Sequence, residues 1–388
     1  MRLALTLSGV IALRMLGLFM ILPVFMILAR DLPGFTPLTG GLAVGIYGLT
    51  QAALQQPFGW LSDRWGRRPV LLMGLFLFAA GGVLAALAES MPLLIAGRAL
   101  QGCGAIAGVA MAFAADFTRP ERRSISMAII GIGIGGAFLL SMMLSVPLAM
   151  VLGLEGLFWL TVIFALAGVL LVFTLPRNLV PVAEPETAVK IDMKPVWLLA
   201  LSVFLLHAVM TLLFVVLPPL LVGTYEFILA EHWKIYVPTM LVSVLIVFPL
   251  LRKVGKSLAE HRMMPWAFFA LAASMAAMGL MDTELGLLGM GVLMTVYFLG
   301  FNVLEAAMPA LLARVSGSRG RGRRMGVYST FQFLGAFAGG IFGGGLLGGF
   351  GSEVALLAAA GSCVVWGIVL KVVLSRILHQ SPQVLTEA

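Results

Sequence analysis

The chain has 388 residues, of which 61% are apolar and 11% are charged, and its mean hydropathy is +1.07. About a quarter of the residues of a soluble domain are charged, so this composition excludes an ordinary soluble protein. A helix needs about 20 mostly apolar residues to cross the hydrocarbon core of a bilayer. The length therefore has room for about twelve such helices joined by short loops.

Proline, glycine and charged residues divide the chain into twelve apolar segments that predict membrane-spanning helices. The first is longer than the apolar part of a signal peptide, and we expect it to remain in the protein as a helix. The segments lie at 5–29, 39–61, 70–88, 92–115, 124–151, 156–175, 196–222, 234–251, 263–281, 285–313, 325–349 and 353–376.

One polar stretch of real length, 176–195, predicts a cytoplasmic linker between two halves of six helices. The N-terminal half is 1–175, the C-terminal half is 196–378, and 379–388 is a cytoplasmic tail. The pattern Gly-Ile-Tyr-x-x-x-Gln at 45–51 returns as Gly-Val-Tyr-x-x-x-Gln at 326–332. A duplicated transporter would give such symmetry, and chance would also suffice. The predicted fold class is an all-α membrane protein with two pseudo-symmetric halves.

The basic residues follow alternate apolar segments. With a cytoplasmic N-terminus, all of them lie on the cytoplasmic side except Arg30, Lys234 and the intramembrane Arg14 and Arg98. This asymmetry predicts that both termini are cytoplasmic in a bacterial inner membrane. The net charge of +8 therefore reflects topology, and we expect the lipid bilayer rather than a nucleic acid as the partner.

Few ionisable side chains lie near the middle of the apolar segments: Arg14, Arg98, His207 and Glu305, with Asp116 at the cytoplasmic end of the fourth segment. Each costs at least ~2.5 to 3.5 kcal/mol at a helix centre, so such residues usually face a protein interior or a water-filled cavity. They occur in the first, fourth, seventh and tenth segments. These are the first members of four three-helix units, so repeat symmetry predicts that they surround one polar translocation cavity.

Glu305 is the candidate for proton coupling, because burial of a carboxyl raises its pKa toward values at which it can load and release a proton. Pro309 cannot donate an amide to the carbonyl of Glu305, so we expect the helix to be weakened there. His207 is the candidate relay, since histidine titrates near neutrality. The alternatives are a permanent ion pair for Glu305 and a plain interhelical hydrogen bond for His207.

Arg14 and Arg98 stay charged in the pH range in which histidine titrates, so they would balance a buried carboxylate or orient an anionic group. Glutamines in the second and fourth segments would bind substrate or join helices. The expected substrate cavity comprises Arg14, Arg98, Gln101, Gln51, Tyr47, Asn302, Tyr328 and Gln332.

Several sequence motifs do not indicate the binding sites that they mark in other proteins, because of their context. Gly131-x-Gly133-x-x-Gly136 matches a dinucleotide fingerprint, but it lies in an apolar span without a preceding strand, so it indicates close helix packing. The glycines at 335, 339 and 343 indicate the same. The chain has no complete Gly-x-x-x-x-Gly-Lys-Ser/Thr phosphate-binding loop, and its histidines lack metal-ligand spacing. We expect no cofactor, no metal site and no catalytic residue, so an enzyme is not predicted.

The stretch 59–69, Gly-Trp-Leu-Ser-Asp-Arg-Trp-Gly-Arg-Arg-Pro, resembles a signature of the major facilitator superfamily. Arg-x-x-Gln-Gly-x-Gly at 98–104 resembles a second signature of its drug:proton antiporter group. Stretches at 13–17, 45–51, 231–234, 301–306 and 326–330 resemble YajR-type efflux transporters along essentially the whole chain.

The resemblance implies a conformational switch in which Asp63 faces the N-terminal end of the eleventh helix and Arg67 pairs with Asp116. A charge at a helix terminus is worth ~0.3 to 2 kcal/mol, enough to bias two alternating states without locking either. The switch residues would be Gly59, Asp63, Arg64, Gly66, Arg67, Arg68 and Asp116.

Two departures from the family pattern concern function. The antiporter Gly-Pro pair is replaced by Ser145-Val146-Pro147, which degrades the antiport signature. YajR-type members carry a small soluble domain after the twelfth helix, whereas this chain ends soon after it, so regulation through that domain is not expected.

The main hypothesis is proton-coupled efflux of small amphiphilic or cationic compounds by a monomer that alternates access between two halves. The alternative is facilitated or coupled export of a sugar or an organic anion. A membrane sensor or scaffold without turnover is the third interpretation.

Overall fold

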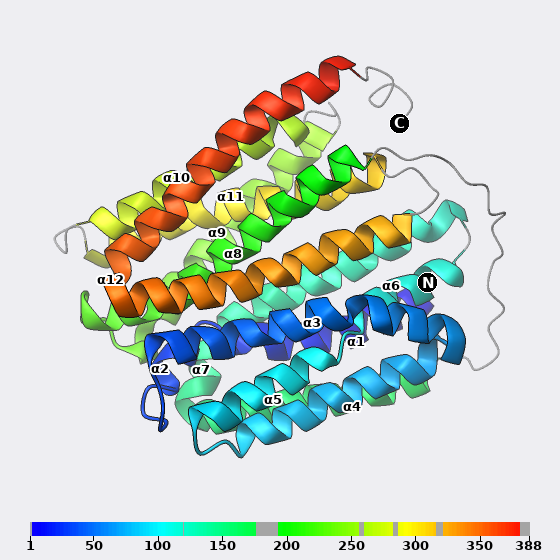
Figure 1. Cartoon of the computed structure of the whole chain (residues 1–388), viewed down its shortest axis with the longest axis horizontal. Helices are drawn as coiled ribbons and strands as arrows, with labels where there is room; N and C mark the ends of the chain where they lie inside the picture. Colours follow the sequence, from blue (N-terminus) through cyan, green and yellow to red (C-terminus); the bar gives the residue numbers. More distant parts are fainter. Residues whose placement is uncertain are drawn as a thin grey trace. The chain divides into compact units, whose positions relative to one another are not determined.

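The computed structural model describes residues 2–118, 120–175, 193–255, 260–281, 286–315 and 321–380. In this part of the chain the regular elements are all helices (Figure 1). They form two compact units, 1–189 and 190–388, which are described separately below. Most of the predicted linker at 176–195 and most of the predicted tail at 379–388 lie outside the described residues.

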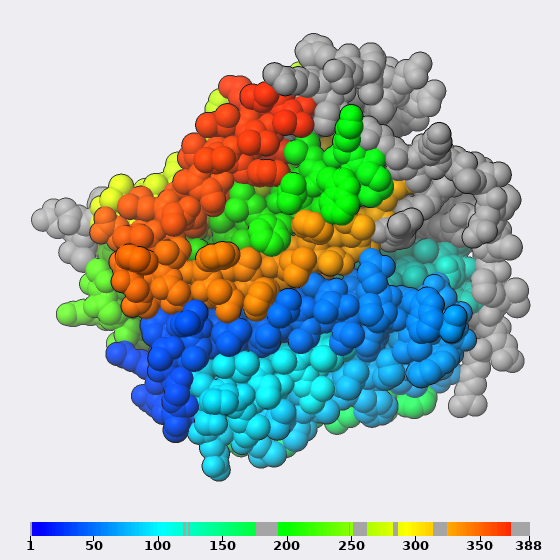
Figure 2. Space-filling model, in the orientation of Figure 1, coloured from blue at the N-terminus to red at the C-terminus, as the bar shows by residue number. Residues whose placement is uncertain are grey.

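Unit 1 begins with a helix that is broken around Pro23 and continues with a well-capped long helix. At the start of that long helix, Thr36 and Thr39 cap each other's backbone amides and Pro37 occupies the first turn. On the face seen in Figure 2, the side chains of α3, α4 and α5 pack against one another. The helices of unit 1 are α1 (Arg2–Ile21), α2 (Phe25–Leu28), α3 (Pro37–Trp65), α4 (Arg67–Ala86), α5 (Met91–Cys103), α6 (Ala107–Asp116) and α7 (Pro120–Phe173).

Unit 2 has one short 3-10 turn before its second long helix. Pro309 lies inside α11, which remains one helix from Gly286 to Val315, so the expected weakening beside Glu305 does not break it. The helices of unit 2 are α8 (Lys194–Gly223), η1 (Leu229–Glu231), α9 (Trp233–Gly255), α10 (Glu260–Leu280), α11 (Gly286–Val315) and α12 (Arg321–Gln380).

The predicted spans correspond to these helices, with breaks where glycine or proline allows them. Gly153 (φ 65°) divides α7, and Gly351 (φ 86°) divides α12, so each holds two predicted spans. These φ values suit glycine because it has no Cβ. The predicted spans 5–29 and 92–115 are each interrupted, at residues 22–24 and 104–106. Eight described helical segments are long and apolar enough to cross a membrane.

Large apolar side chains are exposed along the helices, as expected for surfaces that face lipid. Leu288 is 82% exposed, Val151 81% and Phe350 70%. A soluble monomer rarely exposes so much contiguous apolar surface, and in a membrane this surface contacts acyl chains at no cost.

The predicted glycine packing is confirmed on one helix and is partly wrong on another. A Cβ at Gly335 or Gly339 of α12 would overlap the carbonyl oxygens of Phe204 and Ala208 on α8, so these glycines let the two helices approach closely. On α7, Gly133 approaches Ser8 of α1. No described atom, however, lies within 4 Å of a Cβ built at 131 or 136, because these two positions are on the exposed face of the helix.

Candidate functional site

Two buried arginines of unit 1 converge on one tyrosine ring. Arg14 on α1 and Arg98 on α5 are each 1% exposed. Their guanidinium carbons lie 5.6 Å and 5.2 Å from the ring centre of Tyr47 on α3, and Arg14 also lies 5.4 Å from the ring of Phe78 on α4. Cation–π contacts of this kind are strongest where the cation is desolvated. The aromatic rings therefore supply part of the stabilisation that these cations lose on leaving water.

Arg14 leaves part of its hydrogen-bonding capacity unused. Its Nη2 donates to Gln51 Oε1, and Gln51 Nε2 donates to Gln55 Oε1 at 3.3 Å. Arg14 Nε and Nη1 are buried and have no hydrogen-bond partner among the described residues. In that part of the chain, neither Arg14 nor Arg98 forms an ion pair with a carboxylate. A buried cation with unused donors is costly unless something else compensates it.

Arg98 is tied into the packing of unit 1. Its Nε donates to the carbonyl of Ala43 at 3.2 Å and its Nη1 to Gln101 Oε1 at 2.9 Å. Gln101 Nε2 donates in turn to Thr161 Oγ1 on α7 at 3.0 Å. Both ends of the Gln101 amide are thus engaged within unit 1, which favours the helix-joining interpretation of this glutamine over direct contact with substrate.

A histidine, a glutamate and a glutamine from three helices meet in unit 2. His207 Nε2 on α8 lies 3.9 Å from Glu305 Oε2 on α11 and 2.8 Å from Gln332 Nε2 on α12. His207 Nδ1 lies 3.2 Å from the carbonyl of Val203. This pattern fits a neutral imidazole that donates through Nδ1 and accepts from the Gln332 amide through Nε2. The lone pair on Nε2 is therefore the position at which the next proton would bind.

Glu305 is half-exposed, with 38% of its side chain accessible. Its Oε2, however, is buried without a hydrogen-bond partner among the described residues, and so is the hydroxyl of Tyr328. The predicted cavity residue Asn302 is not part of this cluster and donates to Ser243 Oγ on α9 at 3.0 Å. The structure thus brings together His207, Glu305 and Gln332 of the predicted set, and it places Asn302 in a helix contact.

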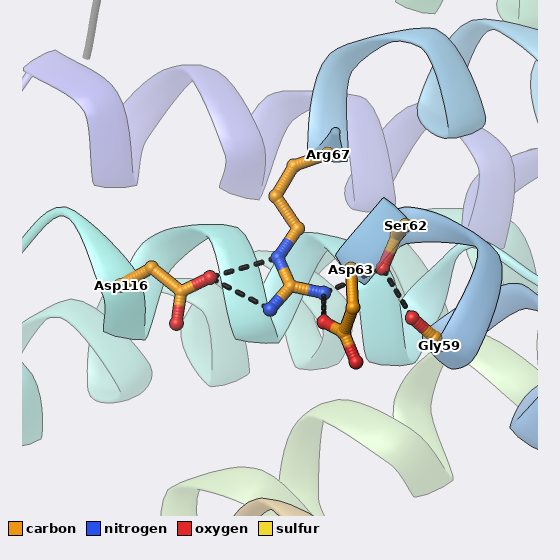
Figure 3. A network of polar contacts seen from close by, with 5 residues as sticks. All are labelled: Gly59, Ser62, Asp63, Arg67 and Asp116. Carbon is orange, nitrogen blue, oxygen red and sulfur yellow. Dashed lines mark hydrogen bonds and ion pairs between the residues drawn. The ribbon is translucent and has the colours of Figure 1, made fainter. Parts of the chain in front are cut away.

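The predicted pair of Arg67 and Asp116 is present at the ends of three helices of unit 1 (Figure 3). Arg67 Nε and Nη2 donate to Asp116 Oδ2 at 2.8 Å and 2.7 Å. Arg67 Nη1 contacts Asp63 and Ser62, and Ser62 Oγ donates to the carbonyl of Gly59 at 2.7 Å. One guanidinium therefore joins the end of α3, the start of α4 and the end of α6.

The remaining predicted switch residues surround this network. Gly66 has φ 90°, a conformation that favours glycine, and it reverses the chain between α3 and α4. The guanidinium carbon of Arg64 lies 4.0 Å from the ring centre of Trp60. Arg68 donates to the carbonyl of Phe173 at 3.1 Å. The expected approach of Asp63 to the N-terminal end of the eleventh helix concerns the other unit and stays a prediction.

Sequence reasoning missed the residues that complete these networks, namely Ser62, Thr161, Ser243 and Phe78. Hydroxyl and phenylalanine side chains are common in membrane helices, so their composition carries no signal. For Ser62 alone, position in the chain offers a sign, because it lies inside the signature stretch next to Asp63.

The known proteins whose sequences resemble this chain are transport proteins of one family. The family model of the Major Facilitator Superfamily matches residues 7–304. The inner membrane transport protein YajR of Escherichia coli (strain K12) is 38% identical over 368 residues, covering 93% of this chain and 80% of the relative. The multidrug resistance protein MdtH of Aeromonas salmonicida (strain A449) is 28% identical over 351 residues, covering 85% and 84%.

Solved structures agree with the helical architecture. A D-xylose–proton symporter superposes with a TM-score of 0.74 at 14% identity, covering 95% of this chain and 96% of the other. The nucleoside transporter NupG superposes with a TM-score of 0.71 at 16% identity, covering 95% and 99%. At these identities the likeness concerns the fold alone.

Proposed function

Since this chain belongs to the major facilitator superfamily and is a multi-pass membrane transporter rather than an enzyme, we propose that it exports small amphiphilic or cationic compounds in exchange for protons. The observation that carries the proposal is the cluster of His207, Glu305 and Gln332. Ionisable groups within membrane-spanning helices usually serve proton or substrate pathways.

The cluster has the parts that a proton exchanger needs. In its neutral form His207 accepts a hydrogen bond from Gln332 at the Nε2 lone pair. Protonation at Nε2 requires the Gln332 amide to rotate and present its oxygen. The carboxylate of Glu305, 3.9 Å away, would stabilise the resulting imidazolium. Glu305 is half-exposed, so its ionised form can meet a cationic substrate and its protonated form can release it.

The Arg67 network would couple this chemistry to alternating access. Arg67 is 17% exposed while Asp63 is 64% exposed, so the aspartate can exchange its partner without desolvating a new charge. Such a network biases two conformations by a small free energy. The name of the MdtH relative supports efflux, and the name of the YajR relative supports a bacterial inner membrane as the location.

The experiment is transport in proteoliposomes that hold a pH-sensitive dye, with an acid-inside gradient and a panel of lipophilic cations and small metabolites. Substrate addition is expected to alkalinise the interior. Glu305→Gln keeps the shape of the side chain and is expected to abolish this signal. Glu353→Gln, at an exposed position of α12, is the matched control and should retain it.

Substrate flux without proton movement, or a proton signal that survives Glu305→Gln, would overturn the exchange mechanism. A membrane sensor or scaffold would show no flux of any compound in the panel.

A second candidate, export of an organic anion, is favoured by one observation. Arg14 is a buried cation with two unused nitrogens and no carboxylate partner among the described residues. A carboxylate or phosphate of a substrate would accept a charge-assisted hydrogen bond from one of these nitrogens. In this case flux of anions in the same panel should fall sharply in Arg14→Gln and be unaffected by the pH gradient.

A further inference from the structure

An open apolar groove lies on unit 2, where the first part of α8 runs beside the last part of α12. Figure 2 shows the atoms of these two segments, green and red, next to one another on one face. The groove has a volume of about 410 Å³, and it is lined by Leu201, Phe204 and Leu205 on α8 and by Gly361, Val365 and Trp366 on α12. Both segments belong to helices apolar enough to cross a membrane.

The groove exists partly because residue 361 is glycine. No atom of the described chain lies within 4 Å of a Cβ built on Gly361, so the helix surface is indented there and a larger side chain would have room to fill it. The neighbouring Val365 is 62% exposed. The surface therefore has an open recess at Gly361, lined by apolar side chains.

The polar atoms at the groove are already bonded inside unit 2. Trp366 Nε1 donates to Ser202 Oγ at 3.0 Å, and Ser202 Oγ donates to the carbonyl of Leu198 at 2.8 Å. The hydroxyl of Ser362 donates to the carbonyl of Ala359 at 2.7 Å. A polar ligand would thus give up its hydration for few hydrogen bonds in return, whereas a hydrocarbon chain loses nothing.

One charged residue lies on the same face of α8 as the groove. Lys194 is exposed and precedes Leu201 by seven residues, so it occupies the same helical face about 10 Å nearer the end of the helix. Trp197, one turn after it, is 46% exposed. Tryptophan is enriched at the level of lipid headgroups, so we expect a lysine one turn before Trp197 to lie near lipid phosphates.

From these observations we infer that the groove binds an anionic phospholipid of the leaflet on the Lys194 side. One acyl chain occupies the recess between Leu205 and Val365, and the anionic headgroup lies at Lys194. Lysine near a membrane surface contributes about 1 kcal/mol to the attraction of anionic lipid. The inference is independent of the proposed substrate and of proton exchange.

The test uses the full chain in detergent and titrates phosphatidylglycerol with a brominated acyl chain, because bromine quenches nearby tryptophan. The part of the quenching that is lost in Trp366→Phe reports occupancy of the groove. Phosphatidylcholine with the same brominated chain is the headgroup control. We expect saturable quenching of Trp366 at several-fold lower concentration of phosphatidylglycerol than of phosphatidylcholine.

Two variants assign the parts of the site. Gly361→Leu fills the recess and is expected to abolish saturable quenching of Trp366. The matched control is Gly349→Leu, at another glycine of α12 where a Cβ meets no described atom within 4 Å, and it should behave as the wild type. Lys194→Gln should remove the preference for phosphatidylglycerol and leave quenching by both lipids.

Quenching that stays saturable in Gly361→Leu would overturn the acyl-chain site. Equal affinity of the wild type for the two lipids would overturn the anionic headgroup. Displacement of the brominated lipid by a transported cation, with no headgroup preference, would mean that the groove binds substrate instead of lipid.

Discussion

Buried charge is held differently at Arg14 and at Arg98, although both side chains are 1% exposed. Arg98 donates to a carbonyl and to Gln101, which itself is bonded to α7. Arg14 keeps two nitrogens without a partner in the described part of the chain. The first arginine therefore has an evident structural role, while the second is kept at a cost that function would explain.

This difference predicts unequal effects of the same substitution. Arg98→Met leaves Gln101 and a backbone carbonyl without their donor, and it is expected to lower the free energy of unfolding by about 1 to 3 kcal/mol. Arg14→Met removes two unsatisfied nitrogens of a buried cation, which offsets the loss of its hydrogen bond to Gln51 and of its two ring contacts, so we expect a smaller change in the free energy of unfolding. If the substrate is an anion, the flux of that anion should also fall. Thermal unfolding in detergent and flux in proteoliposomes measure the two effects. Equal destabilisation by both variants would contradict the distinction.

His232, in the loop between α8 and α9, is fully buried. Its Nε2 lies 2.9 Å from the carbonyl of Phe227, and its ring stacks on that of Phe227 with centres 5.5 Å apart. Nδ1 is buried and has no hydrogen-bond partner within the described ranges. Burial lowers the pKa of His232 below its ordinary value, and the contact with Phe227 offsets this only in part.

A pH dependence of stability follows from this lowered pKa. The unfolded chain binds the proton near pH 6.5, whereas the folded chain binds it only at lower pH. The contribution of His232 to stability is therefore complete above about pH 6.5 and is lost as the pH falls toward the folded-state pKa. Thermal unfolding between pH 8 and pH 5 should show this fall, and His232→Gln should reduce it. An identical pH profile in the variant would contradict the assignment.

At the scale of helices, glycine decides how closely α8 and α12 approach. Gly335, Gly339 and Gly343 lie at four-residue spacing against the backbone of α8. Close approach maximises van der Waals contact, which drives helix association in membranes. The same contact brings Gln332 on α12 within 2.8 Å of His207 on α8, so the packing of these helices also assembles the proposed coupling cluster.

Two alanine substitutions on α12 should therefore differ in effect. Gly339→Ala forces α12 away from the carbonyl of Ala208 and is expected to destabilise unit 2 by about 1 to 3 kcal/mol. It should also weaken proton coupling by displacing Gln332. Gly349→Ala meets no described atom within 4 Å, and it should be neutral or slightly stabilising, because alanine favours the helix by about 0.5 to 1 kcal/mol. Thermal unfolding and proton flux of both variants test this, and equal stability would contradict it.

The network around Arg67 is also an assembly of helix ends. It depends on the reversal at Gly66, which turns the chain so that the start of α4 returns toward the ends of α3 and α6 (Figure 3). Asp116 is 34% exposed and Asp63 64%. Such partly exposed ion pairs contribute little to global stability, so their value would lie in biasing the conformation of the transporter.

At the scale of the whole molecule, the distribution of basic residues predicts that both termini are cytoplasmic. A green fluorescent protein fused to the C-terminus should fluoresce, and alkaline phosphatase fused there should be inactive. Alkaline phosphatase fused after Glu226, in the loop that follows α8, should be active because this loop is predicted to lie outside. The reverse pattern would contradict the orientation.

Much of the fold could be predicted from the sequence, because the free energy of placing a segment in the membrane is a sum over the residues of that segment. Transfer of about 20 apolar residues into hydrocarbon and the position of flanking charges depend on composition alone. Glycine at 66, 153 and 351 marks real breaks, since at each of these positions the backbone adopts a positive φ between two helical segments. The pair of Arg67 and Asp116 was implied by resemblance to the family, and the structure contains it.

The partners of the intramembrane polar groups could not be predicted in this way, because they depend on the rotation and register of packed helices. In sequence, Gly131 and Gly339 look alike, yet one faces open space and the other faces a backbone carbonyl. Likewise Gln101 and Gln332 are both glutamines in apolar spans, but one joins helices and the other reaches His207. Apolar composition thus predicts the membrane-spanning segments, because transfer into hydrocarbon is a sum over residues. The polar contacts between helices depend on tertiary packing, because the rotation and register of each helix select which atoms meet.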